Sequence, residues 1–137
     1  MPIQHERICR SSALLAVINA ADQDHARAKQ AWFDLLAQRE DPVSTNNVLL
    51  ERLALLERRR GLEAVKMLQE EMAPVLRSEW VDETRHLAGV NALLSASRRQ
   101  ISLVDWVSFE TMQRLGLKTV FAFDKHFAEQ GFDLLPS

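Results

Sequence analysis

The sequence is poor in residues that cross-link or interrupt a chain, and it has no long apolar run. Its 137 residues include one cysteine, four glycines and four prolines. The single cysteine, Cys9, excludes an internal disulfide and favours a reducing compartment, so we expect a cytoplasmic protein. No window approaches the roughly 18 uncharged apolar residues of a membrane span. The opening residues MPIQHERICRSS carry charges where a signal peptide needs an apolar run.

No charge of one sign dominates, since the formal net charge is −2. This balance excludes a histone-like binder of nucleic acid, but it leaves room for an RNA enzyme with a local basic rim. Apolar residues make up 47% and charged residues 26%, which is ordinary for a globular protein. The length predicts a single domain over residues 1–137. There is no glycine-rich phosphate loop, zinc-ligand spacing or Ser-His-Asp arrangement.

Segments with helical periodicity alternate with short extended segments. The predicted helices are Ala13–Asn19, His25–Gln38, a helix capped by Asn46 that ends at Arg60, Leu62–Met72, Glu83–Ser95 and Leu103–Leu115. The predicted strands are His5–Arg10, Val43–Ser44, Val75–Trp80, Thr119–Phe123 and Phe132–Leu135. This alternation predicts an α/β fold, a three-layer sandwich in which helices flank a parallel sheet of four or five strands.

The helix over Glu83–Ser95 has an apolar side that we expect to face the core. Its members are Leu87, Val90, Leu93 and Leu94.

Three acids lie at or near the ends of predicted elements: Glu51, Asp105 and Asp124. Each has a simple structural interpretation. Glu51 would be an exposed helix residue, and Asp124 would be a turn aspartate. Asp105 follows Ser102 by three residues, the spacing of a capping box. Taken singly, each of these interpretations is the more common use of the residue type.

The apolar surroundings of the three acids favour a shared site instead. Glu51 lies among leucines, Asp105 lies between Val104 and Trp106, and Asp124 ends the apolar run VFAF. Carboxylates in apolar surroundings are costly unless something cationic compensates them. Carboxylates that converge at the carboxyl edge of a sheet suggest Mg²⁺ or Mn²⁺, which prefer hard oxygen ligands and can activate water.

Several short motifs occur in a fixed order along the chain. They are SALL at Ser12–Leu15, STNNVLLE at Ser44–Glu51, SLVD at Ser102–Asp105 with Ser108–Phe109, RLG at Arg114–Gly116, FAFDKHF at Phe121–Phe127, and Gly131–Phe132. With these motifs the chain resembles the PIN-domain ribonucleases, in particular their bacterial toxin (VapC-type) branch. The block from Ile101 to Phe132 carries the most specific part of this resemblance.

The resemblance implies a function and a set of site residues. It implies a sandwiched parallel sheet, a carboxylate pocket for Mg²⁺ or Mn²⁺, and endonucleolytic cleavage of RNA. It also implies a homodimer and, for a toxin, a cognate antitoxin. Glu51, Asp105 and Asp124 match three of the family's four acidic positions, and we expect them to be the catalytic and metal-binding acids.

The fourth acidic position holds a cation. The family has an aspartate at the end of the first strand, and this chain has Arg10 before Ser11-Ser12-Ala13. We hypothesise that Arg10 pairs with Asp105 or Asp124 and weakens or excludes the metal ion. The alternative is that the first strand lies elsewhere along the chain.

Other polar residues are candidates for substrate binding. Arg98 and Arg99 precede the helix of Asp105, and Lys125 and His126 follow Asp124, so all four could contact RNA phosphates. A solvated surface is the alternative. Ser12 and Asn46 could bind the acids or the substrate, although helix capping explains both.

Two classes of function therefore remain from the sequence. The first is a metal-dependent endoribonuclease of the PIN toxin type. The second is a PIN-fold binding module that keeps its partner or RNA surface after losing metal chemistry. The residue that separates them is Arg10. A third interpretation is an α/β domain in which the acidic residues serve only as caps. This interpretation does not explain the ordered motifs.

Overall fold

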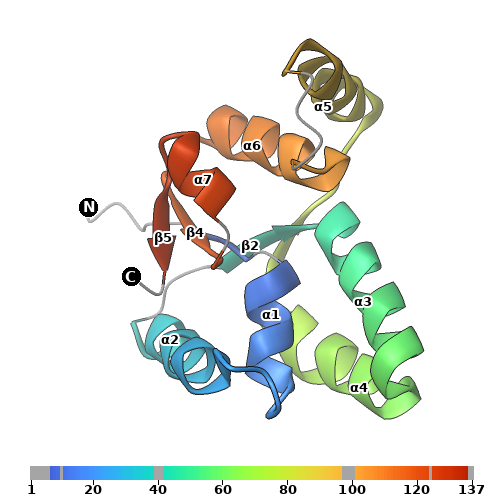
Figure 1. The fold of residues 1–137 in the computed structure, drawn as a ribbon, viewed down its shortest axis with the longest axis vertical. Coiled ribbons are helices and arrows are strands. Elements are labelled where there is room, and N and C mark those ends of the chain that lie inside the picture. Colours follow the sequence, from blue (N-terminus) through green and yellow to red (C-terminus); the bar gives the residue numbers. More distant parts are fainter. Residues whose placement is uncertain (1–6, 10, 39–41, 97–100, 124, 136–137) are drawn as a thin grey trace.

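Five short parallel strands form one sheet in the computed structural model (Figure 1). The structure describes residues 7–9, 11–38, 42–96, 101–123 and 125–135. The sheet order is β3-β2-β1-β4-β5, and every neighbouring pair is parallel. The strands are β1 (Arg7–Cys9), β2 (Pro42–Thr45), β3 (Arg77–Glu79), β4 (Thr119–Phe121) and β5 (Asp133–Leu135).

Helices connect successive strands, as parallel pairing requires. The α-helices are α1 (Ser11–Ile18), α2 (His25–Ala37), α3 (Asn46–Arg60), α4 (Leu62–Met67), α5 (Glu83–Ala96), α6 (Leu103–Leu115) and α7 (Lys125–Glu129). A π-helical segment, Leu68–Met72, and a 3₁₀ turn, Ala73–Val75, continue α4 toward β3. No helix within the described ranges is long and apolar enough to cross a membrane.

The sheet separates two apolar cores, which makes the fold a three-layer sandwich. Successive residues of a strand face opposite sides of the sheet, and in β4 Val120 belongs to one core while Phe121 belongs to the other. The core of Phe121 is built mainly from α1, α2, α3 and the π-helical segment. The core of Val120 is built mainly from α6 and α7. Figure 1 shows α1 and α2 on one side of the sheet, with α6 and α7 on the other. The predicted α/β sandwich is confirmed.

The beginning of α3 differs from the sequence prediction in one residue. Thr45, not Asn46, is the N-cap, and its hydroxyl accepts a hydrogen bond from the backbone N–H of Val48 at 3.1 Å. Asn46 is instead the first residue of the helix, and its side-chain oxygen accepts from the backbone N–H of Val81 at 2.7 Å. Threonine fits the extended cap position at the end of β2, so Asn46 is available to hold the segment after β3 against α3.

The expected inward side of α5 is wrong at two positions. Leu87 is 50% exposed and Leu94 is 69% exposed. The buried position on this helix is Gly89, and a Cβ atom placed there would lie 2.5 Å from Cγ2 of Val107 on α6. The two helices therefore approach closely at Gly89. The side of α5 that packs against α6 consequently differs from the side that its leucines predict.

The C-terminal part contains a helix that the sequence did not predict. The short helix α7 lies between β4 and β5, the two strands predicted in this part of the chain. Phe127 of α7 is fully buried and packs edge-on against Phe109 of α6, with ring centroids 4.9 Å apart. Packing of this aromatic ring explains why the helix forms. The sequence did not predict the helix, because five residues are too few to show helical periodicity.

Candidate functional site

Two of the candidate acids lie on helices that the structure describes, Glu51 on α3 and Asp105 on α6. In the parallel register Cys9 of β1 pairs with Phe121 of β4, and Thr45 of β2 pairs with Glu79 of β3, so these strands end along one edge. Ligand sites of open parallel sheets lie beyond this edge. The chain leaves β2 directly into α3, which carries Glu51. Asp124 and Arg10 are outside the described residues, and so are Arg98 and Arg99.

Asp105 is a buried carboxylate at the first turn of α6. Ser102 is the N-cap of this helix, and its hydroxyl accepts a hydrogen bond from the backbone N–H of Asp105 at 3.2 Å. This bond is one half of the predicted capping box. The Asp105 residue is only 2% exposed, however, and burial of this depth is not needed for capping. The cap fixes the turn, and the carboxylate then lies inside the protein.

Glu51 has a guanidinium beside it. Nη2 of Arg52 lies 3.4 Å from Oε1 of Glu51. The Glu51 side chain is 38% exposed, whereas the Arg52 residue is only 7% exposed and shares the inward side of α3 with Val48 and Leu56. A buried arginine follows the candidate acid directly in sequence, and its positive charge partly offsets the negative charge of Glu51.

The other candidates have different surroundings. Asn46 supports the chain after β3 through its hydrogen bond with the backbone N–H of Val81. Lys125 is exposed at the first position of α7. Nδ1 of His126 lies 3.7 Å from Oε2 of Glu129, one turn along the same helix. The backbone of Ser12 belongs to α1.

Glu51 and Asp105 are the two candidate acids within the described residues. Carboxylate oxygens are the ligands that Mg²⁺ and Mn²⁺ prefer, so the chemistry of Glu51 and Asp105 fits such an ion. Within the described ranges, no three residues of the types His, Cys, Asp and Glu come close enough together to hold a metal. A third ligand would therefore have to come from outside this part of the chain, where Asp124 is the candidate that the sequence offers.

A cleft beside the acids brings in residues that the sequence did not single out. Its volume is about 320 Å³, and it lies between α3, α5 and α6. The lining includes Glu51 and the first turn of α6, next to Asp105, together with Asn47 and His86. His86 belongs to α5, and no spacing in the sequence indicates that α5 lies beside α3. Its role in the cleft therefore follows only from the tertiary structure.

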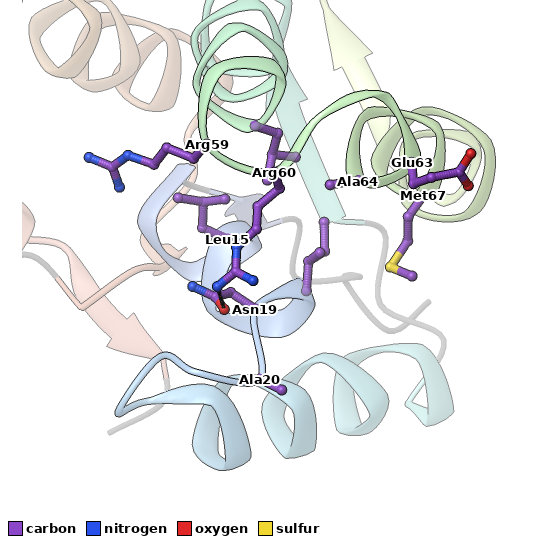
Figure 2. Close-up of a pocket in the computed structure, with 10 residues that line it drawn as sticks. Leu15, Asn19, Ala20, Arg59, Arg60, Glu63, Ala64 and Met67 are labelled. Carbon is purple, nitrogen blue, oxygen red and sulfur yellow. Dashed lines mark hydrogen bonds between the residues drawn. The ribbon is translucent and has the colours of Figure 1, made fainter.

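A second pocket lies between α1, the end of α3, and α4, away from the acids. Its volume is about 430 Å³. Figure 2 shows Arg60 reaching across from α3 to the Asn19 side chain, with which it forms a hydrogen bond. The lining is largely apolar, with Arg59, Arg60 and Glu63 among its charged members (Figure 2). Leu15 of α1 and Met67 of α4 lie on opposite sides of the space.

Comparisons with known proteins identify the fold family. The family model of the PIN domain matches residues 11–133. Among solved structures, VapC20 of Mycobacterium tuberculosis, described as a sarcin–ricin loop cleaving toxin, is 31% identical with a TM-score of 0.80, covering 91% of this chain and 95% of that one. VapBC2 of Rickettsia felis bound to a promoter DNA fragment is 11% identical with a TM-score of 0.69, covering 94% and 96%.

FitAcB of Neisseria gonorrhoeae is 14% identical with a TM-score of 0.67, covering 93% of this chain and 94% of that one. The search of curated proteins found no match. The family match spans most of the chain, and the likeness to VapC20 spans nearly all of both chains. The chain therefore belongs to the PIN-domain family, in the VapC-type branch that its sequence motifs predicted.

Proposed function

We propose that the chain is a Mg²⁺- or Mn²⁺-dependent endoribonuclease and the toxin of a toxin–antitoxin pair. The observation that carries the proposal is the burial of Asp105, 2% exposed, next to the α6 residues that share a cleft with Glu51. A carboxylate is costly to bury, and functional sites are where such costs recur. The likeness to VapC20, a sarcin–ricin loop cleaving toxin, supports RNA as the substrate.

Glu51, Asp105 and Asp124 are the residues that would hold the metal ion. A bound ion of this kind supplies an activated water and neutralises charge on the phosphate during phosphodiester hydrolysis. The chain itself fixes the carboxylates, because Ser102 caps the helix of Asp105 and Thr45 caps the helix of Glu51. Lys125 follows Asp124 in sequence and is exposed, so its ammonium group is suited to bind the RNA phosphate.

The test is internal cleavage of RNA by the purified protein. A structured ribosomal RNA fragment and an unstructured oligoribonucleotide are incubated with Mg²⁺, Mn²⁺ or a chelator. We expect discrete internal cuts that require metal. Absence of cleavage at every metal concentration, with retained RNA or partner binding, would instead favour the non-catalytic module.

A specific observation favours that second candidate function. Arg52 is buried beside Glu51, and Arg10 replaces an acid of the family pattern, so two cations accompany the three candidate acids. Calorimetric titration of Mn²⁺ into the protein and into an Arg10→Asp variant separates the two functions. Tighter binding by the variant supports Arg10 as an internal cation, and equal, tight binding in both proteins contradicts that role.

The proposed partner is an antitoxin that occupies the pocket between α1, α3 and α4. One solved structure with the same fold is a toxin–antitoxin complex from Klebsiella pneumoniae, which supports a partner of this class. The apolar lining with Arg59 and Arg60 suits an amphipathic helix that carries acidic residues. A Met67→Glu variant should lose binding to the cognate antitoxin and keep RNA cleavage.

A further inference from the structure

The cleft between α3, α5 and α6 is separate from the pocket assigned to the antitoxin. The sides are formed by two turns of α3, one residue of α5 and the first turn of α6. The lining residues are Asn47, Leu50, Glu51, Ala54, His86, Leu103 and Val104. Its volume of about 320 Å³ is at the low end of the roughly 300–1,000 Å³ range of small-molecule sites. The cleft is therefore large enough for one planar group and too small for a run of several residues or nucleotides.

The lining combines apolar walls with hydrogen-bonding side chains. The apolar part comes from Leu50 and Ala54 on one side and from Leu103 and Val104 on the other. Asn47 is half-buried in this lining, and its amide both donates and accepts hydrogen bonds.

The other polar residues of the lining are His86 on α5 and Glu51 on α3. His86 contributes an imidazole, which can stack on a ring or form hydrogen bonds through its nitrogens. A purely aliphatic occupant would remove water from the Asn47 amide without replacing its hydrogen bonds, which is unfavourable. A planar ring with polar edges can contact the aliphatic side chains with its faces and form hydrogen bonds with its edges.

The location of the cleft connects it to the reaction. Glu51 contributes to the lining, and Val104 precedes Asp105. A group held in the cleft therefore lies next to the position where these acids would act on a phosphate. In single-stranded RNA, the group next to a phosphate that can leave the stack and enter a pocket is a nucleobase.

We infer that this cleft binds one unpaired nucleobase of the RNA substrate, adjacent to the phosphate that is cleaved. Asn47 reads the polar edge of the base and His86 contacts its ring or edge, while the four aliphatic residues cover its faces. The inference rests on the proposed ribonuclease function and adds a determinant of sequence preference to it. Loops and other unpaired segments of RNA are consequently the preferred targets.

The test measures base preference separately from cleavage. A pool of single-stranded RNA with randomised sequence is bound by the protein without divalent metal, and the bound molecules are sequenced. The same pool is then cleaved with Mn²⁺, and the cut sites are sequenced. The wild type should enrich one base at a fixed distance from the cuts. Asn47→Ala and His86→Ala should each reduce that enrichment about tenfold, the scale of losing one base contact.

The matched control is Asn91→Ala, an exposed asparagine on α5 that does not line the cleft. It should keep the wild-type preference. Two results would overturn the inference: a wild type without base preference, or cleft variants that retain the preference. A base preference in binding without RNA cleavage would support the base site and contradict the ribonuclease function. RNA cleavage with unchanged base preference in both variants would support the ribonuclease function and contradict the base site.

Discussion

At the scale of single residues, Arg52 lies beside Glu51, one of the acids proposed to hold the metal ion, and we expect its charge to lower the affinity for that ion. Replacing Arg52 by Met removes a cation whose Nη2 lies 3.4 Å from the carboxylate. We expect Mn²⁺ affinity to rise about two- to fivefold, since a partly exposed ion pair is worth about 1 kcal/mol or less. Isothermal titration calorimetry measures the change.

The control for Arg52 is Arg58→Met, which removes the same charge from the exposed end of α3. This variant should leave Mn²⁺ affinity close to that of the wild type. Equal affinities for the wild type and both variants would contradict a role of Arg52 at the metal site. A similar rise in both variants would point to net charge, not to the contact with Glu51.

At the scale of elements, α3 depends on a buried cap. Thr45 is fully buried and its hydroxyl accepts from the N–H of Val48. Thr45→Val keeps the shape of the side chain and removes the acceptor, so the free energy of unfolding should fall by about 1–2 kcal/mol. Thr111 is the control, because it is also fully buried and its hydroxyl donates to the carbonyl of Val107, a group inside α6. Thr111→Val should cost about half as much or less in urea denaturation.

The contact of α5 with α6 depends on Gly89. Alanine is ordinarily favoured over glycine in a helix by about 1 kcal/mol. Here a Cβ atom would lie 2.5 Å from Cγ2 and 3.3 Å from the backbone of Val107, so we expect Gly89→Ala to destabilise the protein by about 1–3 kcal/mol. In a double-mutant cycle, Val107→Ala should recover part of that loss. A Gly89→Ala variant that unfolds at a higher temperature than the wild type would show that the helices can move apart freely.

The sequence predicted most of the helices and strands, but it did not predict which of their faces pack together. Periodicity and caps located the long helices, and Gly116 ends α6 in the left-handed conformation expected of a helix-closing glycine. The position of α5 was not predictable, because its leucines suggest one face and the close approach at Gly89 imposes another. The candidate acids rest on sequence motifs and remain a prediction, whereas the place of His86 in the cleft could be found only from the tertiary structure.

At the scale of the whole molecule, an exposed apolar surface supports the expected homodimer. Trp80 is 75% exposed and Leu50 is 68% exposed, and both line a groove of about 390 Å³ between α3 and the segment before β3. Exposed apolar clusters commonly mark interfaces. We expect light scattering to give twice the chain mass for the wild type and the single mass for Trp80→Glu. A Leu62→Glu variant changes another exposed leucine outside this groove and should remain dimeric. A monomeric wild type would contradict this surface as a dimer interface.

Asp105 is proposed to act in metal-dependent RNA cleavage, beyond its place in the first turn of α6 that Ser102 caps. The most direct measurement compares RNA cleavage by the wild type and Asp105→Asn over a range of Mn²⁺ concentrations, with thermal unfolding of both proteins as the check on folding. This role of Asp105 predicts metal-dependent internal cuts by the wild type and at least a hundredfold loss, on the order of what positioned catalytic groups contribute, in a folded variant. Equal cleavage by the two folded proteins would contradict it.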